Sequence, residues 1–185
     1  VLYNVVRDNL ARFLRAHPLR RLGFHGILLG TATMHAVFSV CADVRHLTTL
    51  SVGGADPTLI QNPSQAAAIA AAVAKLIHVQ RLFLDQLDLS ADGITRVLEA
   101  AAGMPNLNEL YLPHRHPDAE ADRAVVELFE KNPSIEWLDV EPPSDRALER
   151  ILALASTRRV APNVTGLDRY IRERELRARM NRMRL

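Results

Sequence analysis

Four potential metal ligands lie close together near the middle of the chain: His114, His116, Asp118 and Glu120. Imidazole nitrogens and carboxylate oxygens bind Zn²⁺ and related ions, and a His-x-His pair can supply two of the ligands. The spacing matches no diagnostic metal motif, and the segment is rich in proline and charge. We therefore expect a solvated loop here, with no metal and no cofactor.

Cys41 is the single cysteine, so it is the only thiol that could act as a nucleophile, and an internal disulfide is excluded. Its neighbours Val37 and Phe38 are apolar and stand at helical spacing, which favours burial as a small hydrophobic side chain. No serine lies in a Gly-x-Ser-x-Gly motif, and Gly53-Gly54 lack the Gly-Lys-Ser/Thr of a phosphate-binding loop. We therefore expect no enzymatic activity in this stretch of chain.

Charge is distributed unevenly along the chain. The net charge is +5 over residues 1–84, −9 over residues 85–150 and +6 over residues 151–185. The acidic middle favours a basic partner. The basic end contains an Arg-rich segment from residue 168 to 185, which could contact the phosphates of nucleic acid or an anionic lipid surface. A solvated helix that ends the fold is the alternative for this segment.

Length and composition bound the class of protein. A chain of 185 residues with 48% apolar and 24% charged residues matches one ordinary globular domain. No apolar run approaches the ~20 residues that a membrane span requires. A single cysteine provides no disulfide framework, which favours an intracellular location.

A motif of the form apolar-x-x-Leu-x-apolar occurs five times, with its central leucines 28, 32, 28 and 28 residues apart. Each occurrence predicts a short strand whose apolar side chains face a core. The five sets are Leu19, Leu22 and Phe24; Leu47, Leu50 and Val52; Val79, Leu82 and Leu84; Leu107, Leu110 and Leu112; and Ile135, Leu138 and Val140. Five occurrences at nearly one period indicate a repeat protein.

Segments with helical spacing separate these motifs. Ser64 and Ser90 are expected N-caps, and Pro105 and Pro133 follow expected helix ends. The expected helices cover residues 31–44, 64–77, 90–102, 118–131 and 144–155. A helix over residues 1–16 is either an N-terminal cap or half of an upstream repeat, and Val164 with Leu167 begins a partial repeat. We predict three regions: residues 1–18, the repeats at 19–156, and a capping segment at 157–185 with an Arg-rich helix.

The alternation of strand and helix at this period resembles the leucine-rich repeat family, and the repeat length resembles its ribonuclease-inhibitor-like subtype. The resemblance covers residues 2–156 and implies an α/β solenoid arc, with parallel strands on the concave face and helices on the convex face. The family usually places Asn or Cys three residues after the strand. Here those positions hold Ile27, Ala55, Leu87, Arg115 and Pro143, so we expect irregular loops. Extra residues around 56–63 predict a protruding loop.

Side chains alternate along a strand, so the residues between the core positions face outward onto the concave surface in three columns. The first column is Arg21, Thr49, Arg81, Glu109 and Trp137; the second is Gly23, Ser51, Phe83, Tyr111 and Asp139; the third is His25, Gly53, Asp85, Pro113 and Glu141.

Three aromatic side chains come together in these columns. Phe83 and Tyr111 are direct neighbours, and Trp137 lies one strand further on a diagonal. Aromatic residues at solvent-facing positions indicate a protein-binding surface, although the rings could instead pack on one another or under the C-terminal segment. The predicted site consists of Arg81, Phe83, Asp85, Glu109, Tyr111, Trp137 and Asp139. Its rim is mostly acidic, so we expect a protein partner with apolar and basic groups.

Two other functions stay open on the sequence alone. The Arg-rich end could bind nucleic acid or an anionic surface. The chain could also be the targeting part of a larger enzyme, for which a bacterial effector is one setting, because leucine-rich repeats occur in receptors, inhibitors and injected effectors. We favour a non-enzymatic module for protein recognition.

Overall fold

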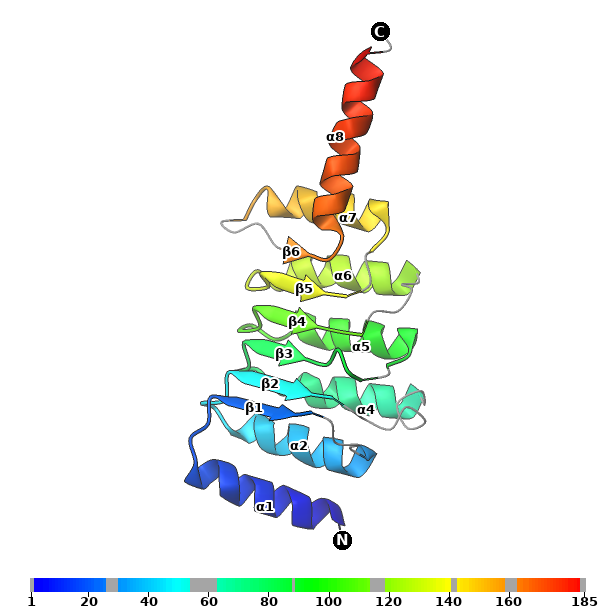
Figure 1. Ribbon diagram of the computed structural model, residues 1–185. Coiled ribbons are helices and arrows are strands. Elements are labelled where there is room, and N and C mark those ends of the chain that lie inside the picture. The colour runs from blue at the N-terminus through cyan, green and yellow to red at the C-terminus, as the bar shows by residue number, and fades with distance from the viewer. Residues whose placement is uncertain are drawn as a thin grey trace.

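The computed structural model is a stack of strand-helix repeats (Figure 1). It describes residues 2–25, 30–53, 63–87, 89–113, 119–140, 143–158 and 163–183. Six parallel strands form one sheet in the order β1-β2-β3-β4-β5-β6. The helices of the repeats lie together on one side of this sheet (Figure 1). The predicted fold class, an α/β solenoid of the leucine-rich repeat kind, is confirmed.

The elements follow the predicted alternation. The strands are β1 (Arg21–Phe24), β2 (Thr49–Val52), β3 (Arg81–Phe83), β4 (Glu109–Tyr111), β5 (Trp137–Asp139) and β6 (Asn163–Val164). The helices are α1 (Leu2–Ala16), α2 (Thr31–Asp43), α4 (Pro63–Val73), α5 (Ala91–Ala102), α6 (Ala119–Lys131), α7 (Asp145–Ala155) and α8 (Leu167–Met183).

The central leucines of the repeats form one buried column across the sheet. Leu50, Leu82, Leu110 and Leu138 are neighbours on successive strands, and all four are fully buried. Each such leucine contributes about 1.5–3 kcal/mol relative to an exposed one. Leu22 continues the column on β1, where it is half-buried because β1 is the edge strand. The apolar repeat is therefore what sets the register of the sheet.

A sixth strand extends the sheet beyond the five expected motifs. Val164 of β6 pairs with Leu138 and is buried, so the partial repeat supplies a real strand. Leu167 is buried as well, but it begins α8. Gly166 lies between the two elements at a φ of 84°, a conformation that favours glycine, and it allows the chain to turn directly from strand into helix.

Most helix boundaries agree with the sequence pattern, and α4 is the exception. The Ser90 hydroxyl accepts a hydrogen bond from the Gly93 amide at 3.1 Å, which confirms this N-cap. Ser64 was expected to cap the next helix upstream, but that prediction is wrong because Ser64 lies inside α4. Pro63 starts α4, a position that suits its fixed φ, and the helix ends at Val73 instead of residue 77.

The third outward column is wrong at two positions. Gly53 and Pro113 are buried instead of facing solvent. The strands are only three or four residues long, so the alternation of side chains ends before this column. The Gln86 side chain lies directly against Gly53, where a Cβ would collide with it. His25 and Asp85 are exposed as expected, and Glu141 lies outside the described residues.

Several loop predictions also concern residues that the structure does not describe. The protruding loop at 56–62 and the family positions Ile27, Ala55 and Arg115 belong to this group. The two family positions that are described, Leu87 and Pro143, are both buried. An apolar residue therefore fills the space at each of these two positions.

Candidate functional site

The candidate site lies on the strand face, by which we mean the side of the sheet that is turned away from the repeat helices. Phe83 of β3 pairs with Tyr111 of β4, and their rings stack with centroids 4.3 Å apart and planes inclined by 13°. Tyr111 also stacks on Trp137 of β5, with centroids 6.4 Å apart. Trp137 pairs with Glu109, so it is the diagonal neighbour of Tyr111, as expected. We call these three residues the aromatic stack.

The aromatic stack combines the two arrangements that the sequence left open. Its rings pack on one another, and contacts of this kind stabilise by about 0.5–1.5 kcal/mol beyond burial alone. They still reach solvent, because Phe83 and Tyr111 are half-buried and Trp137 is 40% exposed. The flanking residues Leu82 and Leu110 fix the rings by holding the backbone in the core. The result is an apolar surface whose rings are already packed on one another.

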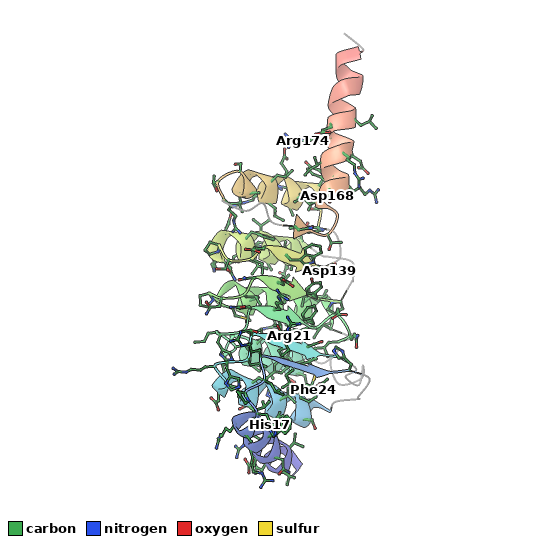
Figure 2. The ribbon with its side chains drawn as sticks, turned by 60° about the vertical axis from the view of Figure 1, so that its left-hand side comes forward. His17, Arg21, Phe24, Asp139, Asp168 and Arg174 are labelled. Atoms are coloured by element: carbon green, nitrogen blue, oxygen red, sulfur yellow. The ribbon has the colours of Figure 1, made fainter. Side chains whose placement is uncertain are left out.

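Charged side chains surround the aromatic stack. Arg81 and Glu109 form an ion pair across β3 and β4 at 3.0 Å. Asp85 is exposed just beyond β3. Asp139, which Figure 2 labels, accepts a hydrogen bond from the Thr165 hydroxyl at 2.6 Å. Three carboxylates against one guanidinium make this rim acidic.

The pKa of Tyr111 reports on the same surroundings. Desolvation raises the pKa of its hydroxyl above the ordinary value, and the negative charges of Glu109 and Asp139 raise it further. The positive charge of Arg81 opposes them. The hydroxyl at the centre of the site therefore stays neutral and keeps its hydrogen to donate.

The residue types that could support catalysis or metal binding are expected from the sequence to do neither. The pKa of Cys41 is raised to about 12 because its thiol is buried in the core, so it is not ionised at neutral pH. His114, His116 and Asp118 fall outside the described residues. In the part of the chain that the structure describes, no three His, Cys, Asp or Glu side chains are grouped as metal ligands.

A hollow lies between α6 and α7 on the helix side, with a volume of about 630 Å³. Its walls carry acidic and basic side chains together. Lys131 pairs with Glu127, and Arg150 pairs with Glu130 at 2.6 Å. Because charges of both signs line the hollow, its charge does not select one kind of ligand.

The predicted Arg-rich helix is present as α8, which projects beyond the last repeat (Figure 1). Arg169, Arg172 and Arg174 are exposed, and Figure 2 labels Arg174 on this helix. Arg169 pairs with Glu173 at 2.8 Å. Each helix in the described part of the chain, α8 included, is too short or too polar to cross a bilayer.

Polar contacts between neighbouring repeats are not predicted by the repeat pattern. Asn132 is buried, and its side-chain amide donates to the carbonyl oxygens of Ala101, Met104 and Leu107, the shortest distance being 2.8 Å to Met104. One repeat later, the Arg158 guanidinium donates to the equivalent carbonyls of Phe129, Asn132 and Ile135. These contacts add side-chain donors to the carbonyl groups at and after the ends of α5 and α6.

A signal for these contacts was present in the repeat alignment. The residue six positions before the central strand residue is apolar in the earlier repeats, where it is Val44, Leu76 or Met104, and becomes Asn132 in the next. A polar residue at a core position indicates a specific hydrogen-bonding role. His78 makes a related contact to the Cys41 backbone, and burial lowers its pKa.

Comparisons with known proteins identify the fold. No protein-family model matches the chain, and no curated protein matches it in sequence. Among solved structures it is similar to a protein described as leiomodin-1 actin-binding site 2 (ABS2), with a TM-score of 0.64 and 13% sequence identity. The match covers 100% of this chain and 99% of that one. At this identity the likeness shows a shared fold along the whole length of the chain.

Proposed function

We propose that this protein is a non-enzymatic recognition module that binds a protein partner on the strand face of β3, β4 and β5. The observation that carries the proposal is the aromatic stack, whose rings pack on one another yet remain accessible, with Trp137 40% exposed. Tryptophan and tyrosine are favoured anchors at protein interfaces because they bury a large area at little cost in side-chain entropy.

The acidic rim narrows the chemistry of the partner. Asp85 follows Phe83 by two residues, Asp139 is the strand neighbour of Tyr111, and Glu109 pairs with Arg81. A partner that places an apolar side chain on Trp137 and a lysine or arginine beside these carboxylates would match both features. Electrostatic complementarity of this kind speeds association and selects the partner more than it adds affinity.

The ribonuclease-inhibitor-like subtype is part of the same proposal, and its support is the spacing of 28 residues between most central leucines. The similar solved structure is described as an actin-binding site, so monomeric actin is one purified candidate to test. An effector role is compatible with a recognition module. The identity of the bound partner would then determine the effect.

The proposal is tested by affinity capture with three forms of the full chain. These are the wild type, Trp137→Ala and Ile77→Ala, the last being a matched control because Ile77 is an apolar side chain 55% exposed outside the strand face. We expect the wild type and Ile77→Ala to retain the same protein and Trp137→Ala to lose it. With the captured protein or actin in purified form, Trp137→Ala should raise Kd by about 30-fold, as for an interface anchor.

Two results would contradict the proposal. Equal capture by all three forms would move binding away from the aromatic stack. A Trp137→Ala protein that melts far below the Ile77→Ala control would mean that the tryptophan serves the core of the fold.

The exposed arginines of α8 favour a second candidate function, binding of nucleic acid. Nucleic-acid binding would be indicated by an affinity for a short DNA duplex that decreases steeply between low and physiological salt. Truncation of the chain after Thr165 would abolish this binding. Binding that depends on Trp137 and changes little with salt would support the protein-binding function instead.

A further inference from the structure

Helix α8 has two different sides. Leu167 is buried, and Tyr170 and Ile171 pack against the core, so the first turns of the helix are anchored to the last repeat. Leu176 follows on the same helix and is 59% exposed. At 100° per residue, the nine residues from Leu167 to Leu176 place them on opposite sides of the helix. An apolar position therefore stands on the free side of α8.

Basic residues accompany this free apolar position. Arg172 lies one turn before Leu176 and is exposed. Helical spacing puts Arg172 on the same side of the helix as Leu176. The helix as a whole carries six arginines against three acidic residues. One apolar anchor beside an arginine is the chemistry that the strand face of β3, β4 and β5 would accept.

Within one molecule the two surfaces are separate. Helix α8 continues away from the repeats past α7, whereas the aromatic stack lies on β3, β4 and β5 (Figure 1). Figure 2 likewise shows Arg174 beyond the end of the repeats and Asp139 at the level of the strands. A second molecule can bring them together. The 17 residues of α8 extend about 25 Å, while three strands about 4.8 Å apart span about 10 Å, so one helix covers the aromatic stack.

We propose that α8 of one copy of this chain docks on the strand face of β3, β4 and β5 of a second copy. Leu176 contacts the aromatic stack, while Arg172 faces the carboxylates of Glu109 and Asp85. The proposal rests on the proposed function, because it names a second copy of the chain as a partner for the same face. If each of two copies docks its α8 on the strand face of the other, the result is a closed dimer. If not, each copy binds a further copy and a head-to-tail chain of molecules forms.

The test uses charge reversal on each surface of the full-length chain. One variant carries Glu109→Lys and Asp85→Lys, and the other carries Arg172→Glu. A control carries Lys75→Glu, which makes the same charge change as the α8 variant at an exposed position in the turn after α4. Sedimentation velocity over a range of concentrations measures self-association, and thermal melting checks that each variant is folded.

We expect the wild type and the control to self-associate, more weakly as salt rises. Each reversed variant alone should associate about tenfold more weakly, and an equimolar mixture of the two should recover the association, since opposite charges again meet. Replacing Leu176 with serine should weaken association without lowering the melting temperature.

A wild type that stays monomeric at all concentrations overturns the proposal, and so does association that neither variant changes. Both results leave the protein-binding function to the capture experiment, in which loss of a foreign partner from Trp137→Ala would still support it. A reversed α8 charge that abolishes DNA binding in a monomeric protein would assign the helix to nucleic acid instead.

Discussion

The strand face differs between the two halves of one regular sheet. On β1 and β2 the outward residues are Arg21, Gly23, Thr49 and Ser51, whereas on β3, β4 and β5 they are Arg81, Phe83, Glu109, Tyr111, Trp137 and Asp139. The pairing register and the central leucine are the same in both halves. The backbone therefore has the same arrangement along the sheet. Among the strand residues that the structure describes, the aromatic and acidic side chains of the strand face lie only on the second half of the sheet, on β3, β4 and β5.

The second half also has side-chain hydrogen bonds from one repeat to the backbone of the preceding one. The side chains of Asn132 and Arg158 bind carbonyl groups of the preceding repeats there, while at the other end the edge strand β1 leaves Leu22 and Phe24 only half-buried. A binding surface gains from a rigid support, because less conformational entropy is lost on binding. The comparison thus links the location of the site to the stability of the repeats beneath it.

The largest expected difference between the halves concerns the buried leucine column. Replacing Leu110 with alanine should lower the free energy of unfolding by about 3 kcal/mol, because a fully buried leucine leaves a cavity between α5, α6 and the sheet. The same change at Leu22 should cost about half as much, since that side chain is half-buried at the edge. Urea denaturation of both variants measures the two losses. Equal losses would show that the first half is packed as tightly as the second.

A smaller effect should come from the polar contacts between repeats. Replacing Asn132 with methionine, the residue at the equivalent position one repeat earlier, should lower the free energy of unfolding by about 2 kcal/mol, because its buried side-chain hydrogen bonds to the preceding repeat are lost. The matched control is Asn106→Ala, whose exposed amide donates to the Ile77 carbonyl at 2.8 Å and should contribute less than about 1 kcal/mol. If Asn132→Met were neutral, hydrogen bonding would not distinguish the second half.

The sequence predicted the parts of this molecule that repeat and missed those that occur once. The spacing of the leucines gave the strand register, and alternation then brought Phe83, Tyr111 and Trp137 together correctly. Alternation failed at Gly53 and Pro113, since it describes an extended strand and these residues lie beyond the strand ends. Whether the rings would stack or face solvent depended on side-chain angles that residue type does not determine.

The contacts of Asn132 and Arg158 depend on a different kind of information. Each forms because three carbonyls of a neighbouring repeat converge on one point, and such convergence is a property of three-dimensional packing. The repeat pattern shows only that a polar residue, Asn132, stands at a position that is apolar in the earlier repeats. The candidate site could be predicted because its residues follow the strand register. The packing between the repeats beneath it could be predicted only as a repeating apolar pattern.

The smallest expected effect is a shift in the titration of Tyr111. Desolvation, Glu109 and Asp139 raise the pKa of its hydroxyl, so the neutral form is favoured in the folded state. The associated stability is present below the unfolded pKa of about 10 and is lost as pH rises through the folded pKa. Replacing Glu109 with glutamine should move that pKa toward 10, whereas Glu99→Gln on the outer side of α5 should leave it unchanged.

Ultraviolet absorbance titration measures this shift, and the difference from a Tyr111→Phe protein assigns it to the one hydroxyl. Since desolvation is the first cause of the raised pKa, anything that docks on the aromatic stack should raise it further. A basic partner would oppose that rise through its charge, as Arg81 does now. The direction of the change on binding therefore reports whether apolar contact or positive charge dominates at the centre of the site, and a pKa that does not respond would place the partner away from β4.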